Sequence, residues 1–188
     1  MNSNQILFLN KLTYLNNVTV HLSWREKQTG IFYLKQNNVN YYFLDYGDYF
    51  DRDGFYGYPD DGERFAFFSK AVLEVLPLID FYPDILQAND WHTALCPVFL
   101  DVFYRFTEDY KKIKTVFTIH NIEFQGKYND SLIGDILGLP EWARPLVMMN
   151  DCVNYMKGGI ESSNAVITVS ETSSSKLPFL KSLKIGRL

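Results

Sequence analysis

The sequence predicts an α/β protein built on a Rossmann-like, doubly wound parallel sheet. In the second half of the chain, short apolar segments typical of buried strands alternate with helical segments, which is the pattern of a parallel sheet covered by helices. The chain has 188 residues, of which 47% are hydrophobic. This length suits one domain with a substantial core.

The first elements are expected to be antiparallel strands. Three runs of β-branched and aromatic residues are separated by turn-forming residues at 28–30 and 37–38. The expected strands are residues 18–24, 31–35 and 39–45. Residues 48–62 follow, and because they are dense in Gly, Asp, Tyr and Pro without periodicity, we predict a loop. A loop of this length is typically functional.

A helix is expected after the loop, because apolar residues from Phe65 to Leu76 recur every three to four positions and end near Pro77. Beyond it, strands are expected at 84–88, 114–120 and 165–170, and helices at 90–104, 141–149 and 151–161. In the last helix, the adjacent Gly158 and Gly159 each cost about 1 kcal/mol relative to alanine. They indicate close packing on a neighbouring strand or, alternatively, a backbone site for a ligand.

Composition excludes several classes of function. The net charge of -4 has the wrong sign for a nucleic-acid partner. Cys96 and Cys152 form no metal-binding or disulfide pattern, so buried free thiols are expected. The N-terminus has neither a membrane span nor the features of a signal peptide, which favours a cytoplasmic protein without membrane contact. Aromatic residues make up 16% of the chain and favour a bulky core over sugar-stacking platforms.

Several standard catalytic motifs are absent from the sequence. No GxGxxG follows a strand, and neither GxxxxGK[ST] nor GxSxG occurs, so the usual marks of hydride and phosphoryl transfer are missing. The histidines at 21, 92 and 120 lack the spacing of a zinc site. We therefore expect neither a metal nor a cofactor.

Two polar patches follow predicted parallel strands, where ligands collect in open α/β sheets. In the first, Asp90 is expected to be a helix N-cap, with His92 in the first helical turn facing the strand-end crevice. The alternative is that Asp90 only caps, Trp91 packs and His92 is an ordinary surface histidine. The second patch, His120 and Asn121, ends the next strand. Its alternative is hydrogen bonding to the loop backbone, but the two patches together favour a polar pocket.

Four segments resemble, in order and spacing, the bacterial glycogen synthase and plant starch synthase family. They are YFDRDGFYGYPDDGERFAFF, NDWHTALCPVFL, KTVFTIHNIEFQGKY and NYMKGGIESSNAVITVS. The resemblance extends over residues 18–172. It implies the N-terminal half of a two-domain GT-B glycosyltransferase, with residues 1–188 as a partial, acceptor-side domain that lacks the C-terminal domain.

The implied reaction moves glucose from ADP-glucose to the non-reducing end of an α-1,4-glucan, with retention. His92 matches a family histidine that contacts the transferred sugar, and Asp60 matches an acidic residue at the acceptor site, so both are expected to be catalytic. The expected substrate-binding residues are Asp90, Trp91, His120, Asn121 and Gln125. A carboxylate and a fixed hydrogen-bond partner suit an oxocarbenium-like centre and a sugar hydroxyl.

The sequence also departs from the family pattern. No first strand with a Lys-Thr-Gly-Gly loop precedes Val18, the C-terminal domain is absent, and Gln87 and Glu171 replace the usual histidine and proline. We therefore expect a fragment, incomplete at both ends, that is inactive alone. Either residues 5–9 substitute for the first strand or the exposed sheet edge leads to a homo-oligomer.

Two other functions remain open from the sequence. One is a catalytically silent glucan-binding module that keeps the acceptor cleft without donor chemistry. The other is a non-carbohydrate Rossmann-like domain that shares the strand-end motifs by chance.

Overall fold

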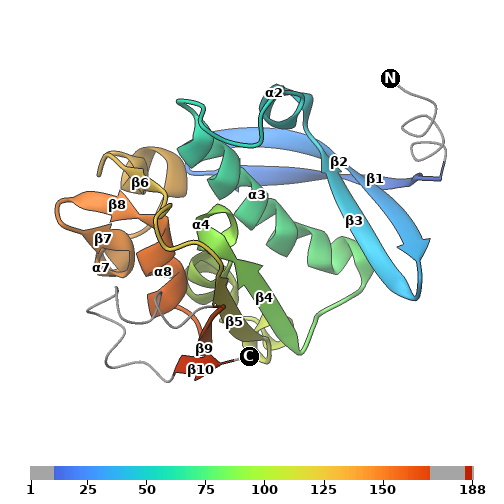
Figure 1. Ribbon diagram of the computed structural model, residues 1–188. Helices are drawn as coiled ribbons and strands as arrows, with labels where there is room; N and C mark the ends of the chain where they lie inside the picture. The colour runs from blue at the N-terminus through green and yellow to red at the C-terminus, as the bar shows by residue number, and fades with distance from the viewer. Residues whose placement is uncertain (1–10, 170–184, 188) are drawn as a thin grey trace.

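The computed structural model describes residues 11–169 and 185–187. These residues form an antiparallel sheet, a parallel sheet and a small antiparallel sheet (Figure 1). The residues 5–9 proposed above as a substitute strand, and Ser170 at the end of a predicted strand, lie outside the described ranges.

The antiparallel sheet has the order β1-β2-β3, as the sequence predicts. Its strands are β1 (Thr13–Leu22), β2 (Arg25–Gln36) and β3 (Val39–Asp45). The turn between β2 and β3 is the predicted one, and Asn37 and Asn38 both have positive φ, at 51° and 62°, as a two-residue hairpin turn requires.

The turn predicted at residues 28–30 is wrong, because these residues continue β2 and the chain reverses at Ser23 and Trp24 instead. Thr29 pairs with Val18 and is 1% exposed, and its hydroxyl donates to the carbonyl of Asp45. Pairing with two neighbouring strands therefore overrides the local turn propensity of this segment.

A long helix lies between the two larger sheets. It is α3 (Asp61–Val75), followed by the 3-10 turn η1 (Leu76–Ile79), which contains Pro77 near the predicted end. The short helix α2 (Gly47–Phe50) and residues 51–60 precede it, so most of the predicted loop is confirmed. Figure 1 shows α3 running between β1–β3 and the parallel sheet, and its buried Phe67, Ala71 and Leu73 join the core.

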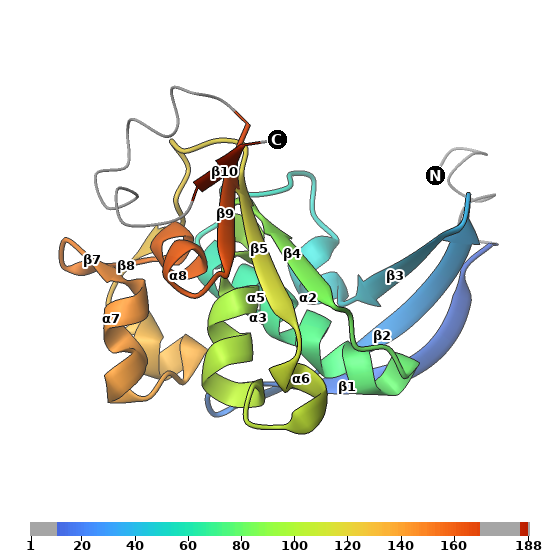
Figure 2. The same cartoon turned by 90° about the horizontal axis from the view of Figure 1, so that it is seen from below.

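The parallel sheet confirms the predicted α/β class. It has the order β10-β9-β5-β4, and all of its pairs are parallel. Its strands are β4 (Ile85–Asn89), β5 (Lys114–Ile119), β9 (Ala165–Thr168) and β10 (Ile185–Arg187). Figure 2 shows this sheet and its helices on one side of the molecule and β1–β3 on the other.

Helical segments connect the parallel strands. The predicted helix at 90–104 forms as α4 (Asp90–Thr93), α5 (Leu95–Phe99) and the π-helical η2 (Leu100–Tyr104), and α6 (Glu108–Lys111) follows. Between β5 and β9 lie β6 (Lys127–Tyr128), η3 (Ile133–Leu137), η4 (Glu141–Ala143), α7 (Arg144–Val147), β7 (Met148–Met149), β8 (Cys152–Asn154) and α8 (Tyr155–Glu161). The helices predicted at 141–149 and 151–161 are shorter than expected, because Met149 pairs with Cys152 in a sheet of order β6-β8-β7.

The adjacent glycines of α8 are explained by close packing. A Cβ atom on Gly158 would lie 2.9 Å from side-chain atoms of Val98 and Val147. A Cβ atom on Gly159 would lie 2.9 Å from Ala94 and 3.0 Å from Phe117, which belongs to β5. The helix therefore contacts α5 and the sheet at distances that only glycine permits.

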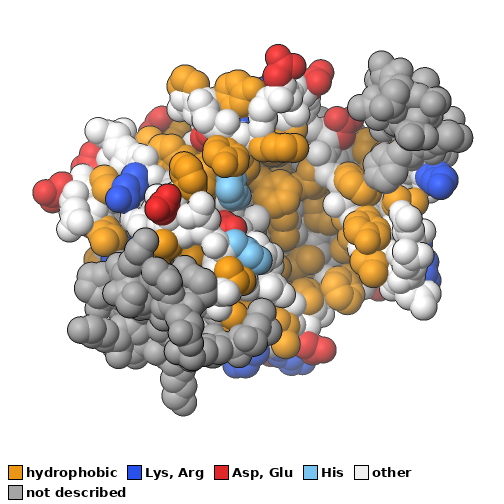
Figure 3. Space-filling view, in the orientation of Figure 1, with side chains coloured by type: hydrophobic (Ala, Val, Ile, Leu, Met, Phe, Trp, Pro, Cys, Tyr) orange, Lys and Arg blue, Asp and Glu red, His pale blue; other side chains and the backbone are white. Residues whose placement is uncertain are grey.

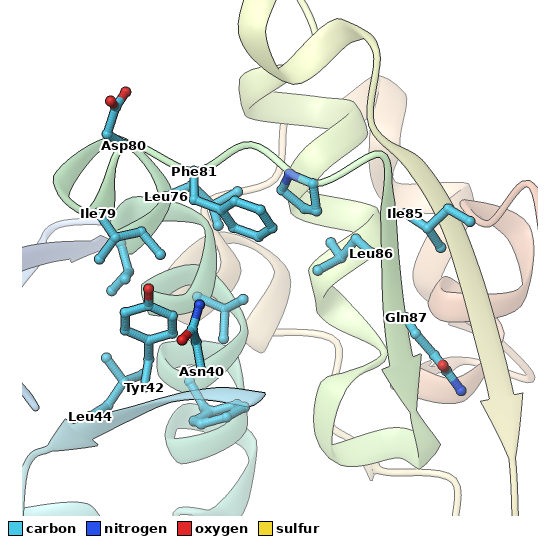
Figure 4. Close-up of a pocket in the computed structure, with 14 residues that line it drawn as sticks. Asn40, Tyr42, Leu44, Leu76, Ile79, Asp80, Phe81, Ile85, Leu86 and Gln87 are labelled. Carbon is cyan, nitrogen blue, oxygen red and sulfur yellow. The ribbon is translucent and has the colours of Figure 1, made fainter. Parts of the chain in front are cut away.

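The prediction of a buried strand at 84–88 is wrong for most of β4. Ala88 is buried, but Ile85 is 61% exposed, because β4 ends the parallel sheet and pairs only with β5 among the described residues. Beside this edge lies a groove of about 630 Å³, walled by β3 and α3 opposite β4. Figure 4 shows Tyr42 and Leu86 on its facing walls.

Candidate functional site

The structure brings the two polar patches together at the carboxyl ends of β4 and β5. Asn89, the last residue of β4, is aligned with Thr118 near the end of β5, so both strands end side by side. His120 Nε2 lies 3.2 Å from Asn89 Oδ1. The prediction that the patches share one strand-end site is therefore confirmed in its geometry.

Asp90 links the two strand ends, and its predicted N-cap role is wrong. Asn89 occupies the N-cap position of α4, while Asp90 is the first helical residue and has φ of 54°. Its Oδ1 accepts hydrogen bonds from the backbone N–H groups of His120, at 2.8 Å, and Asn121, at 3.1 Å. These two hydrogen bonds help to hold a backbone conformation that is uncommon for a residue with a side chain.

A small cavity of about 140 Å³ lies at these strand ends. Its lining combines aromatic rings with a carboxylate, an amide and an imidazole: Tyr56, Asp90, Trp91, His92, Asn121 and Phe124. Pockets that enclose a drug-sized ligand are typically about 300–1,000 Å³. The cavity therefore suits one end of a ligand, such as a single sugar unit.

His92 is half-buried among aromatic rings. Its ring centroid lies 4.1 Å from that of Trp91, 4.8 Å from Phe65 and 5.3 Å from Tyr56. Burial lowers the pKa of His92 below its usual 6.5, although the nearby carboxylates of Asp90 and Asp61 oppose this shift. The imidazole is therefore neutral near pH 7, with one nitrogen able to donate and the other able to accept a hydrogen bond.

Trp91 forms the inner wall of the cavity and is 5% exposed. Gly126 packs against it with φ of 64°, and a Cβ atom there would lie 2.7 Å from the indole ring. The indole N–H is buried and has no acceptor among the described residues. An unpaired buried donor costs about 1–3 kcal/mol, so an acceptor for this N–H would stabilise the protein.

Two predicted site residues lie beside the cavity without lining it. His120 is exposed and contacts Asn89. Gln125 stabilises the loop, because its Nε2 donates to the carbonyl of Ile122 and its Oε1 accepts from Asn154 Nδ2 at 2.8 Å. Their role in binding a substrate remains a prediction.

Asp60 is also absent from the cavity lining. Both of its carboxylate oxygens lie 2.6 Å from the guanidinium of Arg52, which lowers the pKa of Asp60. The structure thus gives Asp60 a partner within the loop, and its catalytic role remains a prediction.

Sequence reasoning missed two aromatic residues at the mouth of the cavity. Tyr56 is 49% exposed and Phe124 is 50% exposed, and their ring centroids lie 6.0 Å apart. In Figure 3, histidine side chains lie at the surface among hydrophobic ones. Exposed aromatic rings beside polar groups are suited to stack on the apolar face of a ligand.

Residues 11–169 and 185–187 contain neither a candidate metal site nor a candidate membrane-spanning helix. No group of three or more His, Cys, Asp or Glu side chains in these ranges could hold a metal ion. Within the same ranges, every helix is too short or too polar to cross a bilayer.

Comparison with known proteins identifies the family. Residues 2–178 match the family described as the starch synthase catalytic domain. The chain belongs to this family. The resemblance found in the sequence is therefore confirmed.

Relatives with curated descriptions agree with this assignment. The chain is 48% identical over 161 residues to the glycogen synthase of Lactobacillus acidophilus, and 42% identical over 167 residues to that of Caldicellulosiruptor bescii. These matches include 85% and 88% of this chain but only 34% and 35% of the relatives. The chain thus spans about a third of their length.

A solved structure extends the likeness to the fold. The catalytic domain of starch synthase IV from Arabidopsis thaliana, bound to ADP and acarbose, is 30% identical, with a TM-score of 0.77. The match includes 88% of this chain and 35% of that one. The fold is therefore that of part of a GT-B glycosyltransferase catalytic domain, as the sequence predicts.

Proposed function

We propose that this chain forms part of the acceptor-side domain of a retaining glucan synthase, which transfers glucose from ADP-glucose to an α-1,4-glucan in the cytoplasm. The observation that carries the proposal is the cavity at the strand ends, where a neutral His92 shares the lining with the exposed rings of Tyr56 and Phe124 and with the amide of Asn121. Membership of the starch synthase family supports the same reaction.

Each part of the cavity has a chemical task in this proposal. Tyr56 and Phe124 offer ring faces to a glucose unit, while Asn121 and His92 hydrogen-bond its hydroxyl groups. Asp90 fixes the loop that carries Asn121. These contacts orient the sugar, which lowers the entropic cost of reaching the transition state.

Among residues 11–169 and 185–187, the lining of the cavity offers no positive charge to a diphosphate leaving group. Its described lining contains neither Lys nor Arg, and the nearby Arg64 is 2% exposed and paired with Asp61. Stabilising a departing ADP requires cations or N–H donors, so this proposal assigns these contacts to residues outside the described lining. The same observation favours the second candidate, a glucan-binding module without donor chemistry.

Glucan binding tests the proposal on the polypeptide itself. We expect maltoheptaose to bind in isothermal titration calorimetry, and we expect Tyr56→Ala and Phe124→Ala each to raise Kd by about fivefold, which corresponds to roughly 1 kcal/mol of lost ring contact. Both side chains are half exposed, so the variants are expected to fold.

The matched control is Phe106→Ala, because Phe106 is an exposed aromatic residue, at 79%, that does not line the cavity. It should leave Kd unchanged. Absence of maltoheptaose binding at millimolar concentration, or an equal effect of all three variants, would contradict the proposed site.

We further propose that the protein self-associates through the exposed edge of β4. Unpaired edges of this kind template pairing with another chain, and Ile85 adds an apolar side chain that is 61% exposed. We expect a dimer or larger species at micromolar concentration in analytical ultracentrifugation, shifted toward the monomer by Ile85→Lys but not by the control Phe106→Lys. A wild-type monomer throughout this range would refute the idea.

A further inference from the structure

A buried ion pair lies close to the aromatic cavity, at the start of α3. Asp61 and Arg64 are 5% and 2% exposed, and Arg64 Nη1 lies 2.5 Å from Asp61 Oδ1. The guanidinium also lies 5.1 Å from the ring of Phe65, which contacts His92. Burying two charges is costly, so a buried pair is weak evidence for stability. The other hydrogen bonds of Asp61 and Arg64 show which segment of the chain the pair holds in place.

Both members of the pair hold the backbone of one loop, residues 51–60. Asp61 Oδ2 accepts hydrogen bonds from the N–H groups of Gly57, at 2.5 Å, and Tyr58, at 3.0 Å. Arg64 Nη2 donates to the carbonyl of Phe55 at 3.3 Å. The held groups lie on both sides of Tyr56 in the chain.

Tyr56 itself is poorly anchored by packing. Its side chain is 49% exposed, and the next residue, Gly57, has φ of 100°, with nothing within 4 Å of a Cβ atom placed there. The Tyr56 ring nevertheless lies 5.3 Å from His92 and 6.0 Å from Phe124. Besides these ring contacts and a further one to Trp91, hydrogen bonds to the neighbouring backbone restrain the position of this ring.

We infer that Asp61 and Arg64 are positioning residues, which order the loop at 51–60 so that Tyr56 forms one wall of the sugar-binding cavity beside His92. Only the identity of the ligand rests on the proposed function. The sequence predicts a catalytic role for Asp60, the residue before Asp61. In the structure, the carboxylate of Asp60 pairs with Arg52.

Loop order can be measured without any ligand. In the double variant Asp61→Ala/Arg64→Met, both buried charges are removed together, which is often tolerated because no unpaired charge remains. By NMR, we expect the N–H groups of Gly57 and Tyr58 to exchange with solvent at least about tenfold faster than in the wild type, as for a locally opened segment.

The charges of the pair can be tested separately through His92. The charged groups that act on His92 are Asp61 and Asp90, which raise its pKa, and Arg64, which lowers it. Because Asp61 acts on His92 more strongly than Arg64 does, the double variant Asp61→Ala/Arg64→Met should lower the pKa of His92, measured from the pH titration of its ring resonances. The control Asp135→Asn breaks a pair with Arg25 elsewhere and should leave that pKa unchanged.

Coupling to the ligand completes the test. If the pair acts through Tyr56, the double variant Asp61→Ala/Arg64→Met should weaken maltoheptaose binding about threefold when Tyr56 is present but have no effect in a Tyr56→Ala background, as expected for interacting residues in a double-mutant cycle. Additive effects in the two backgrounds would overturn the inference.

The outcomes separate this inference from the proposed function. Unchanged amide exchange and an unchanged His92 pKa, in variants that still bind maltoheptaose, would refute the positioning role and leave the glucan site intact. Faster exchange and a shifted His92 pKa in a protein that binds no maltoheptaose would confirm the positioning role and refute the glucan site.

Discussion

The 188-residue polypeptide alone is expected to release no ADP above the blank when it is mixed with ADP-glucose and glycogen. No Lys or Arg in the described part of the chain lines the cavity, and the nearby guanidinium of Arg64 is buried against Asp61. Removing a single electrostatic contact to a developing charge typically costs about 10²–10³ in turnover. With the leaving-group contacts lacking in the cavity, we expect a rate at least about 10³-fold below that of an intact relative.

A coupled assay for ADP checks this expectation. The glycogen synthase of Lactobacillus acidophilus is the positive control, since it is 48% identical over the matched 161 residues.

A chimera in which this chain replaces that matched region tests whether the cavity supports turnover once the rest of the enzyme is supplied. ADP release by the pure polypeptide, dependent on both ADP-glucose and glycogen, would contradict the expectation. An inactive but folded chimera would instead favour the silent binding module.

The strand-end site was predictable because it depends on topology. Parallel neighbouring strands place their carboxyl ends at one edge, so two polar motifs that each follow such a strand must lie close together. The contact between His120 and Asn89 confirms this reasoning. The fold class was predictable for a similar reason, since the alternation of short apolar runs and helices is encoded along the chain.

Positions set by tertiary contacts were not predictable. The segment 28–30 has the composition of a turn but pairs with β1 and β3 inside the sheet. Asp90 has the sequence context of an N-cap, but its carboxylate accepts from the backbone of another strand end. In both cases a partner distant in sequence decides the conformation, and single-sequence propensity does not contain that partner.

The irregular loop at 51–60 shows the same limit within the site. Because the segment has no periodicity, the sequence identifies it as a loop. The same lack of periodicity means that the sequence does not show which side chains point toward the cavity. The sequence therefore could not distinguish Asp60 from Asp61, although the first pairs with Arg52 and the second holds the backbone next to Tyr56. The guanidinium of Arg52 and the backbone N–H of Gly57 make that distinction.

His92→Ala is expected to lower kcat of the active chimera by at least about tenfold, because losing a fixed hydrogen-bond partner misplaces the reacting sugar, and a misplacement of about 1 Å can cost about 10²-fold. The variant should still fold. His92 is half-buried, and losing its ring contacts should cost roughly 1 kcal/mol, as for an aromatic pair.

The effect of pH on stability tests the burial of His92, and turnover tests its chemical role. Because burial lowers the pKa of His92 below 6.5, the folded protein binds a proton there less readily than the unfolded chain does. Its contribution to the free energy of unfolding is therefore complete above pH 6.5 and is lost as pH falls toward the folded-state pKa. Urea denaturation from pH 7.5 to 5 should show this loss in the wild type and a smaller loss in His92→Ala. Normal turnover in a stable variant would show that the imidazole has no chemical role. A variant that unfolds would show that the main role of His92 is packing.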